Sequence, residues 1–213
     1  MSKMESIILI GGGGHCLSAI DVIESNNQFE IKGILDVSEK VGQDILDYPI
    51  IGTDDQIPEL ISETPNFLIT VGQIRNSNTR QKIFQKVINA KGKLPVINSG
   101  LAYISKHAQI EEGTIVMHGV IINAGATIGM ACIINSKALI EHEAVVGDFT
   151  HISTGSILNG QVTVGSNCFI GSNTVVANNI TICNDVVIAA GSQVLKSINQ
   201  PGIYIGNPLR KIR

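Results

Sequence analysis

Hydrophobic residues follow two different rhythms along the 213-residue chain. In about the first 95 residues, short aliphatic runs alternate with segments of helical spacing. From Ile104 onwards an aliphatic residue returns every six positions, and all 16 positions of this series, through to Val194, are Ile, Val or Leu. A fixed short period of this kind is typical of a parallel β-helix, in which each repeat adds one strand.

The N-terminal rhythm predicts a small parallel α/β sheet. Alternating strands and helices are expected at 6–10, 17–25, 31–36, 54–62, 67–72 and 80–90. Strands that alternate with helices form parallel sheets, because each helix returns the chain to the same edge. We therefore expect a Rossmann-like domain at 1–97, a β-helix at 98–199 and a C-terminal tail at 200–213, with the domain and the tail closing the two ends of the β-helix.

The six-residue period predicts which side chains of the β-helix face inwards. The first and fifth residues of each hexapeptide face the interior, and the third and sixth face outwards. The fifth residues are accordingly small or β-branched, as at Ala126, Cys132 and Ala144. Three hexapeptides form one triangular coil, so about 90 residues give about five coils and a prism ~24 Å long.

Three histidines fall on outward positions, namely His118, His142 and His151. None is expected in the core, and a solvated surface imidazole is as good an interpretation as a functional one. At the 18-residue spacing of a coil, His142 has Gly160 above it and Ala124 below it, two residues without bulk. Reachable backbone amides beside an imidazole are what a general base with an adjacent oxyanion site needs.

Acidic neighbours strengthen the candidate base. Glu141 and Glu143 flank His142, and a carboxylate bonded to one ring nitrogen fixes the tautomer and raises the basicity of the other nitrogen. A solvated charged turn would give the same pattern. His118 lies 24 residues before His142, on a different corner of the prism, so these two side chains cannot share a site within one chain.

A glycine loop, ILIGGGGHC at 8–16, links the first predicted strand to a helix. It nearly fits the dinucleotide pattern GxGxxG, and Asp36 follows about 20 residues later, but Cys16 stands where the last glycine is expected. The first region also leaves no room for a hydride-transfer domain. Because glycine loops at helix N-termini bind phosphate in many contexts, we expect the diphosphate of a sugar nucleotide here rather than NAD.

Composition narrows the class of protein further. The net charge is −3 with no long basic run, which argues against a nucleic-acid partner. No segment reaches the ~20 apolar residues of a membrane span, and Ile7–Ile10 is too short for a secretory signal. The four cysteines form neither a CxxC pair nor a zinc spacing. We expect a cytoplasmic protein with reduced thiols and no metal.

The stretch SKALIEHEAVVGDFTHISTG (136–155), together with the glycine loop and the terminal GIYIGNPLRKIR, resembles the NeuD/PglD-like family of sugar O- and N-acetyltransferases. The resemblance extends over essentially the whole chain. It implies a left-handed β-helix, acetyl-CoA as co-substrate, and a homotrimer with its sites between neighbouring prisms. It also implies direct acetyl transfer to the 4-amino group of a nucleotide-linked amino-dideoxy sugar, for surface glycan or glycoprotein biosynthesis.

The resemblance also implies roles for individual residues. His142 matches the catalytic base and Glu143 the carboxylate that tunes it. The positions matching the acetyl-CoA site are His151, Gly160, Ser172 and Ala190, and those matching the nucleotide-sugar site are Gly13, Gly14, His15, Asp36 and Gly72. One position departs from the family, because relatives often carry a side chain where this chain has Gly12. Any contact made by such a side chain is lost here.

Three alternatives stay open at this point. A sialic acid O-acetyltransferase is the nearest, because the same base could deprotonate a hydroxyl. A zinc hydro-lyase of the γ-carbonic anhydrase type needs an H-x4-H pair, and no two histidines have that spacing. A non-catalytic scaffold would bind the sugar nucleotide and leave acetyl-CoA untouched. The motifs distinguish neither the sugar nor UDP from dTDP or GDP.

Overall fold

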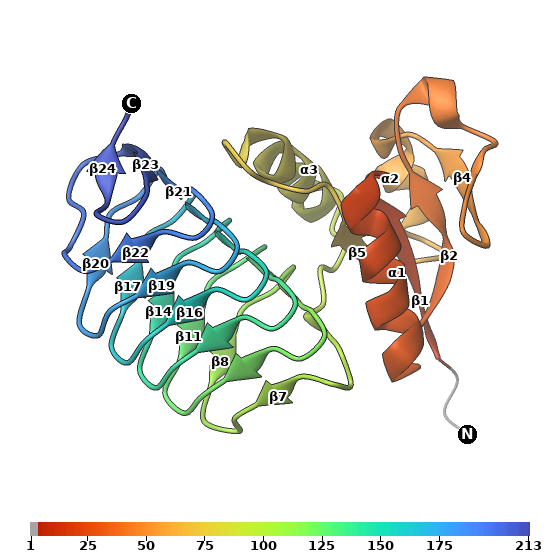
Figure 1. Cartoon of the computed structure of the whole chain (residues 1–213). Coiled ribbons are helices and arrows are strands. Elements are labelled where there is room, and N and C mark those ends of the chain that lie inside the picture. Colours follow the sequence, from red (N-terminus) through yellow and green to blue (C-terminus); the bar gives the residue numbers. More distant parts are fainter. Residues whose placement is uncertain (1–3) are drawn as a thin grey trace.

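The computed structural model describes residues 4–213 and contains two regions of different architecture (Figure 1). An α/β domain with a five-stranded sheet comes first, and a left-handed parallel β-helix of stacked triangular coils follows. This confirms the fold class expected from the two hydrophobic rhythms. Among the described residues, no helix has both the length and the apolar character needed to cross a membrane.

The N-terminal sheet has the strand order β3-β4-β2-β1-β5, and all its neighbours are parallel except β3 and β4. Its strands are β1 (Glu5–Ile10), β2 (Phe29–Leu35), β3 (Asp44–Ile45), β4 (Tyr48–Gly52) and β5 (Asn66–Ile69). Its helices are α1 (Gly14–Asn26), α2 (Ile57–Leu60) and α3 (Asn78–Asn89), with short 3-10 turns η1 (Ser38–Lys40) and η2 (Asp54–Gln56). The inner strand β1, between β2 and β5, buries Ile7 to Ile10 on both faces, as a parallel strand covered on both sides must.

The β-helix has three faces built from two- and three-residue strands. The first face holds β7 (Tyr103–Ile104), β10 (Ile121–Ile122), β13 (Leu139–Ile140), β16 (Ile157–Leu158), β19 (Val175–Val176) and β22 (Gln193–Val194). The second holds β8 (Gln109–Ile110), β11 (Thr127–Ile128), β14 (Val145–Val146), β17 (Thr163–Val164) and β20 (Thr181–Ile182). The third holds β6 (Ile97–Asn98), β9 (Ile115–Val116), β12 (Ile133–Ile134), β15 (His151–Ile152), β18 (Phe169–Ile170) and β21 (Val186–Ile188).

The interior of the prism follows the six-residue period. Partners on neighbouring coils are 18 residues apart, as Ile122 and Ile140 are, so each aliphatic residue stacks on another. The small fifth residues are buried too, including Ala126, Cys132 and Ala144. Full burial of an aliphatic side chain stabilises a fold by about 1.5–3 kcal/mol, and this column repeats that contribution in every coil.

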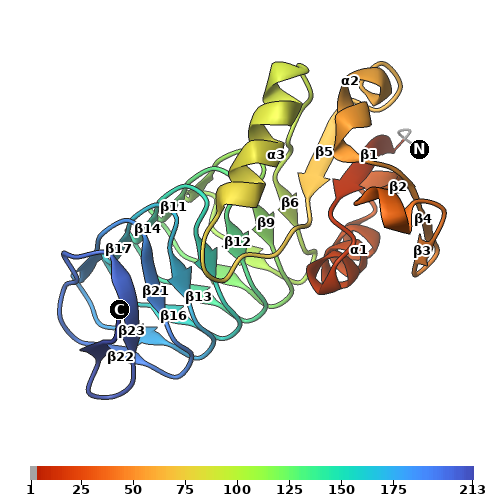
Figure 2. The same ribbon diagram turned by 90° about the horizontal axis from the view of Figure 1, so that it is seen from above.

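The N-terminal domain lies against the third face near its first coils (Figure 2). The Asn26 side chain, at the end of α1, donates to the carbonyl of Asn98 in β6 at 2.8 Å. The outward residues of this face, Ile115 and Ile133, are consequently buried. The outward residues of the first face are not covered, and Tyr103 is 60% exposed.

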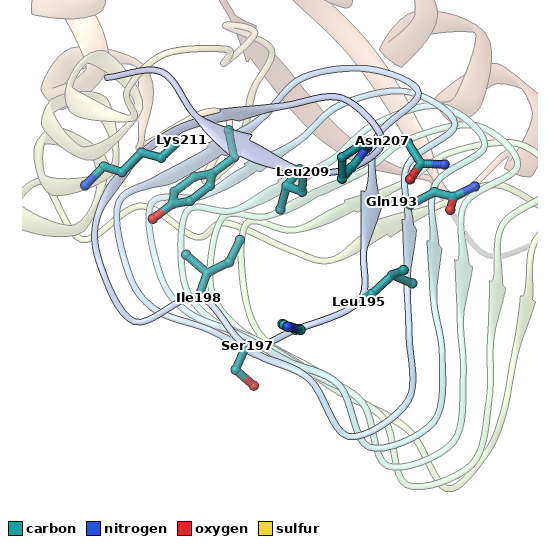
Figure 3. Close-up of a pocket in the computed structure, with 10 residues that line it drawn as sticks. Gln193, Leu195, Ser197, Ile198, Asn207, Leu209 and Lys211 are labelled. Atoms are coloured by element: carbon teal, nitrogen blue, oxygen red, sulfur yellow. The ribbon is translucent and has the colours of Figure 1, made fainter.

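The C-terminal tail extends the third face beyond its last coil strand, and Tyr204 and Leu209 of the tail pack against the hydrophobic core. Strand β23 (Gly202–Ile205) pairs in parallel with β21, and β24 (Arg210–Lys211) folds back antiparallel to β23. Strand β23 thus covers the free hydrogen-bonding edge of β21 at this end of the prism. A cavity of about 370 Å³ remains at this end, lined by residues that include Leu195, Ile198 and Lys211 (Figure 3).

Candidate functional site

His142 lies at the corner between the first and second faces, in the turn from β13 to β14. Its side chain is 57% exposed, and its backbone amide donates to Glu141 Oε2 at 3.2 Å. The side chain of Asn123, one coil below, donates to the same oxygen at 3.0 Å. Glu141 therefore holds the turn and not the imidazole.

Glu143 is the carboxylate next to the ring. Its Oε2 lies 3.4 Å from His142 Nδ1 and accepts a 3.0 Å hydrogen bond from Gln161 Nε2. Glu143 has φ of 59°, in the left-handed region, which turns the chain at the corner and places its side chain beside the ring. With the carboxylate at Nδ1, the neutral imidazole carries its proton there, and Nε2 is left free to accept one.

Gly160 lies directly beside the free nitrogen. A Cβ placed on Gly160 would fall 2.6 Å from His142 Nε2, so only glycine leaves room for the ring in this position. The space that the sequence predicted beside the histidine is thus filled by the imidazole itself. Among residues 4–213, no hydrogen-bond acceptor is found for the Gly160 amide.

His151 corrects the expectation for outward histidines. It points out of the prism on β15 as predicted, but the N-terminal domain covers it and leaves it 8% exposed. Its Nδ1 donates to the carbonyl of Gln73 at 2.8 Å, and Asn135 Nδ2 lies 3.2 Å from its Nε2. The pKa of His151 is lowered to about 4, mainly by burial; the hydrogen bond to Gln73 opposes this shift, and the charge of Arg80 adds to it. The imidazole is neutral at pH 7.

His118 lies at the contact between the β-helix and the N-terminal domain. Its Nε2 lies 2.8 Å from Asp21 Oδ2 on α1, and its Nδ1 lies 2.6 Å from Ser99 Oγ. It sits after β9, at the corner between the third and first faces, away from the corner that carries His142. This confirms that the two histidines are on different corners.

The glycine loop lies at the carboxyl ends of β1, β2 and β5, where open parallel sheets bind ligands. A cavity of about 720 Å³ opens there, lined by residues that include Gly11, Asp36, Glu39, Thr53, Asp54 and Val71. Nothing lies within 4 Å of a Cβ placed on Gly13 or Gly14, so the α1 N-terminus is open to a ligand. A phosphate would meet free backbone amides there.

The carboxylate of Asp36, which was expected to contact the nucleotide sugar, is hydrogen-bonded to the glycine loop. Its Oδ2 accepts hydrogen bonds from the Gly12 amide at 2.8 Å and from Lys40 Nζ at 2.9 Å, and its Oδ1 accepts one from the Val37 amide. Burial raises the pKa of this carboxyl, but these hydrogen bonds outweigh burial and hold the pKa below its usual value. A Cβ on Gly12 would stand 2.7 Å from Asp36 Oδ2, which explains why this position carries no side chain.

His15 lies beneath the loop, beside Gly72. A Cβ on Gly72 would be 3.8 Å from His15 Cβ, and His15 Nε2 is buried without a hydrogen-bond partner among the described residues. Burial lowers the pKa of His15 to about 3, with smaller contributions from the charges of Arg80 and His151. His15 is therefore a neutral hydrogen-bonding group in this site and not a cation.

The residues expected to contact acetyl-CoA fall in three places within one chain. Gly160 shares the corner of His142, whereas Ser172 and Ala190 lie 18 residues apart at the corner between the third and first faces. Ser172 Oγ lies 2.9 Å from Ser153 Oγ. His151 lies under the N-terminal domain, closer to His15 than to the corner of His142.

Comparisons with known proteins agree with the two-region architecture. Residues 6–87 match the model of the PglD N-terminal domain, and residues 143–178 and 162–196 match bacterial transferase hexapeptide repeats. PerB from Caulobacter crescentus, solved with CoA and GDP-perosamine, is 27% identical with a TM-score of 0.91, covering 99% of both chains. The chain belongs to the PglD/NeuD-like family of hexapeptide sugar acetyltransferases.

Other known proteins align with the whole chain or with part of it. The acetyltransferase domain of PglB from Neisseria gonorrhoeae, solved with acetyl coenzyme A, is 26% identical with a TM-score of 0.91, over 99% of this chain and 100% of that one. A curated relative, the uncharacterized protein L142 of Acanthamoeba polyphaga mimivirus, is 39% identical over 112 residues. That match spans 52% of this chain and only 21% of the viral protein.

Three residues of the site in this family member were not found from the sequence. Gln161 orients Glu143, Gln73 bonds His151, and Arg80 lies buried behind the glycine loop. Gln161 and Gln73 carry no motif of their own, since a glutamine is compatible with any solvated turn. Arg80 falls at the start of a predicted helix, and no sequence signal indicates that its guanidinium is buried.

Proposed function

We propose that this family member transfers the acetyl group of acetyl-CoA to the amino group of a nucleotide-linked amino-dideoxy sugar. The observation that carries the proposal is the pairing of His142 with Glu143 at Nδ1 and Gly160 at Nε2, on an exposed corner. Two similar structures were solved in complex with CoA and GDP-perosamine, and another in complex with acetyl coenzyme A. A glycine loop with open amides supplies the site for a diphosphate.

In the proposed reaction, the neutral amine attacks the thioester carbonyl and a C–N bond forms. His142 Nε2 accepts the proton that the amine loses, and the Gly160 amide donates to the carbonyl oxygen as it gains negative charge. The C–S bond then breaks, and the CoA sulfur takes the proton from His142. The ring returns to its starting state, so the transfer needs no covalent intermediate on the enzyme.

Glu143 supports this cycle from the other ring nitrogen. Its carboxylate stabilises the imidazolium that forms when Nε2 takes the proton, and Gln161 keeps the carboxylate in place. The 3.4 Å separation is long for a hydrogen bond, and such contacts often tighten when substrate binds. His142 and Glu143 would thus act as a unit.

The proposed enzyme is a homotrimer, because one chain does not bring its catalytic base and its glycine loop together. His142 and the glycine loop lie on different sides of the prism, and His151 is committed to the loop's side. The first face carries an uncovered apolar column along its coils: Tyr103, Ile121, Leu139, Ile157 and Val175. The second face is mostly polar and presents Gln109, Thr127, Thr163 and Thr181, together with one partly exposed valine, Val145. A second copy on the first face would bring the corner of His142 to a neighbour's loop.

The test is release of CoA thiol from acetyl-CoA in the presence of UDP-, dTDP- and GDP-linked 4-amino-4,6-dideoxy sugars, with free sialic acid as a further acceptor. We expect turnover with one amino-sugar nucleotide, reduced about 10²–10⁴-fold by His142→Ala. His118→Ala is the matched control and should keep full turnover. Near-normal turnover of His142→Ala would refute the assigned base.

The same panel separates the alternatives. Turnover with sialic acid alone would make the protein an O-acetyltransferase. Binding of a sugar nucleotide without any thiol release, in wild type as in His142→Ala, would favour a scaffold.

A further inference from the structure

Arg80, on α3, is a buried cation without an anion. The residue is 1% exposed, and its guanidinium donates to three carbonyls, those of Ile69 at 2.9 Å, Val71 at 2.8 Å and Ala131 at 2.7 Å. Among residues 4–213, no carboxylate forms an ion pair with it. Buried arginines are normally paired, because removing an unpaired charge from water is costly.

The guanidinium lies directly behind the glycine loop. One of its acceptors, Ile69, is the last residue of β5, and another, Val71, lies just beyond it. Val71 packs so tightly on Gly11 that a Cβ on this glycine would stand 2.5 Å from Val71 Cγ2. Thr70 Oγ1 donates to the Gly11 carbonyl at 2.7 Å in the same layer. One layer of backbone therefore separates the charge of Arg80 from the loop.

Other positive charges near the loop are weak candidates for neutralising a phosphate. His15 and His151 are neutral at pH 7, because burial and the charge of Arg80 lower the pKa of His15 to about 3 and that of His151 to about 4. Lys40 is half-exposed and already paired with Asp36 at 2.9 Å. The guanidinium keeps its proton, since burial lowers the pKa of Arg80 only to about 10.

We propose that Arg80 is the buried counter-charge for the ligand's diphosphate, acting through the field of its guanidinium while the loop amides make the direct contacts. This inference rests on the proposed function and adds to it the residue that gives the site its charge preference. A charge behind a water-poor layer acts more strongly than one in water and is screened little by salt. It also explains why the fold retains an unpaired guanidinium, since the ligand supplies the missing anion.

The test compares a charged ligand with its uncharged counterpart. Calorimetry or competition gives the Kd of each nucleoside diphosphate (GDP, UDP and dTDP) and of its uncharged nucleoside (guanosine, uridine and thymidine). The quantity compared for each pair is the ratio of the nucleoside Kd to the diphosphate Kd. We expect Arg80→Gln to lower this ratio about tenfold to thirtyfold and Arg80→Lys to preserve most of it. Lys40→Gln is the matched control and should change the ratio less than about threefold. A merely structural role of Arg80 would weaken nucleoside and diphosphate by the same factor, and that outcome overturns the inference.

A second measurement needs no variant and covers the case in which Arg80→Gln does not fold. Between about 0.05 and 0.5 M NaCl, the wild-type ratio should fall less than about threefold, because a buried charge is poorly screened. A ratio that falls to near one in high salt would assign the preference to an exposed lysine and overturn the inference. Wild type that binds none of the three diphosphates would overturn the proposed function as well. Wild type that binds, with Arg80→Gln retaining the full ratio, would overturn only the role of Arg80.

Discussion

The imidazole of His142 lies against Gly160 so closely that a Cβ on the glycine would stand 2.6 Å from both Cε1 and Nε2. Gly160 has no left-handed φ, so alanine is compatible with its backbone and only the ring must move. We predict that Gly160→Ala lowers kcat about tenfold to a hundredfold by displacing the base. Affinity for the sugar nucleotide, measured by calorimetry, should not change.

The control for this prediction is Asn178→Ala, at the same position one coil further along the chain. It changes the same corner without adding bulk beside the ring, and we expect nearly full kcat. Unchanged kcat in Gly160→Ala, with the thermal midpoint also unchanged, would show that the contact between His142 and Gly160 has no catalytic importance.

The glycine loop gives a second prediction, because its glycines are required for different reasons. A Cβ on Gly12 would lie 2.4 Å from Ile45 Cδ1 and 2.7 Å from Asp36 Oδ2, whereas nothing lies near one on Gly13. Gly12→Ala should therefore destabilise the fold by about 1–3 kcal/mol. Gly13→Ala should leave stability unchanged and weaken nucleoside diphosphate binding. Urea unfolding and calorimetry on both variants check this, and equal stability of the two would contradict the packing argument.

Acid should destabilise the protein through its buried histidines. An unfolded histidine binds a proton near pH 6.5, whereas the folded pKa is about 4 for His151 and about 3 for His15, in both cases mainly because of burial. Between these values the unfolded chain binds more protons, so stability is fully present above about pH 6.5 and is lost as pH falls towards 4. The shift of His151 alone corresponds to about 3 kcal/mol.

Urea denaturation followed by circular dichroism at fixed protein concentration, at about pH 7 and about pH 4.5, measures this loss. His151→Gln should lose about 2–3 kcal/mol less than wild type over that interval. His118→Gln, which removes a histidine that contacts Asp21 and Ser99, is the matched control for the loss of an interface histidine. An identical loss in all three proteins would contradict the assignment to His151.

The repeats of the β-helix could be predicted because each interior residue contacts residues at the same position of neighbouring coils. Every inward position, such as Ile122 or Ile140, meets an equivalent residue 18 positions away, so the period alone specifies the stack. The α/β region was predicted less completely. Strand β4 was missed, because Pro49 interrupts its short apolar run and Pro is weakly compatible with a strand.

The environment of the site was harder to predict than its residues. That His151 faces out of the prism follows from the period, but its burial depends on Gln73, 78 positions earlier in the chain. The same holds for Arg80, whose acceptor Ala131 belongs to the other region. Contacts between two independently patterned regions leave no periodic signal, so only the assembled fold places them.

The first face of the prism gives the last prediction. Ile121 is 42% exposed on this face and is the second residue of the apolar column, whereas Thr127 occupies the equivalent outward position on the mostly polar second face. If a second copy covers the column, Ile121→Lys places a charge in an apolar interface, where burial without a partner is strongly unfavourable. We predict that Ile121→Lys sediments as a monomer and loses more than about 90% of wild-type turnover while still binding nucleoside diphosphate, because the glycine loop is complete within one chain. Thr127→Lys should remain oligomeric and active. An active monomer of Ile121→Lys would show that the corner of His142 works without a neighbour, and the intersubunit site would have to be abandoned.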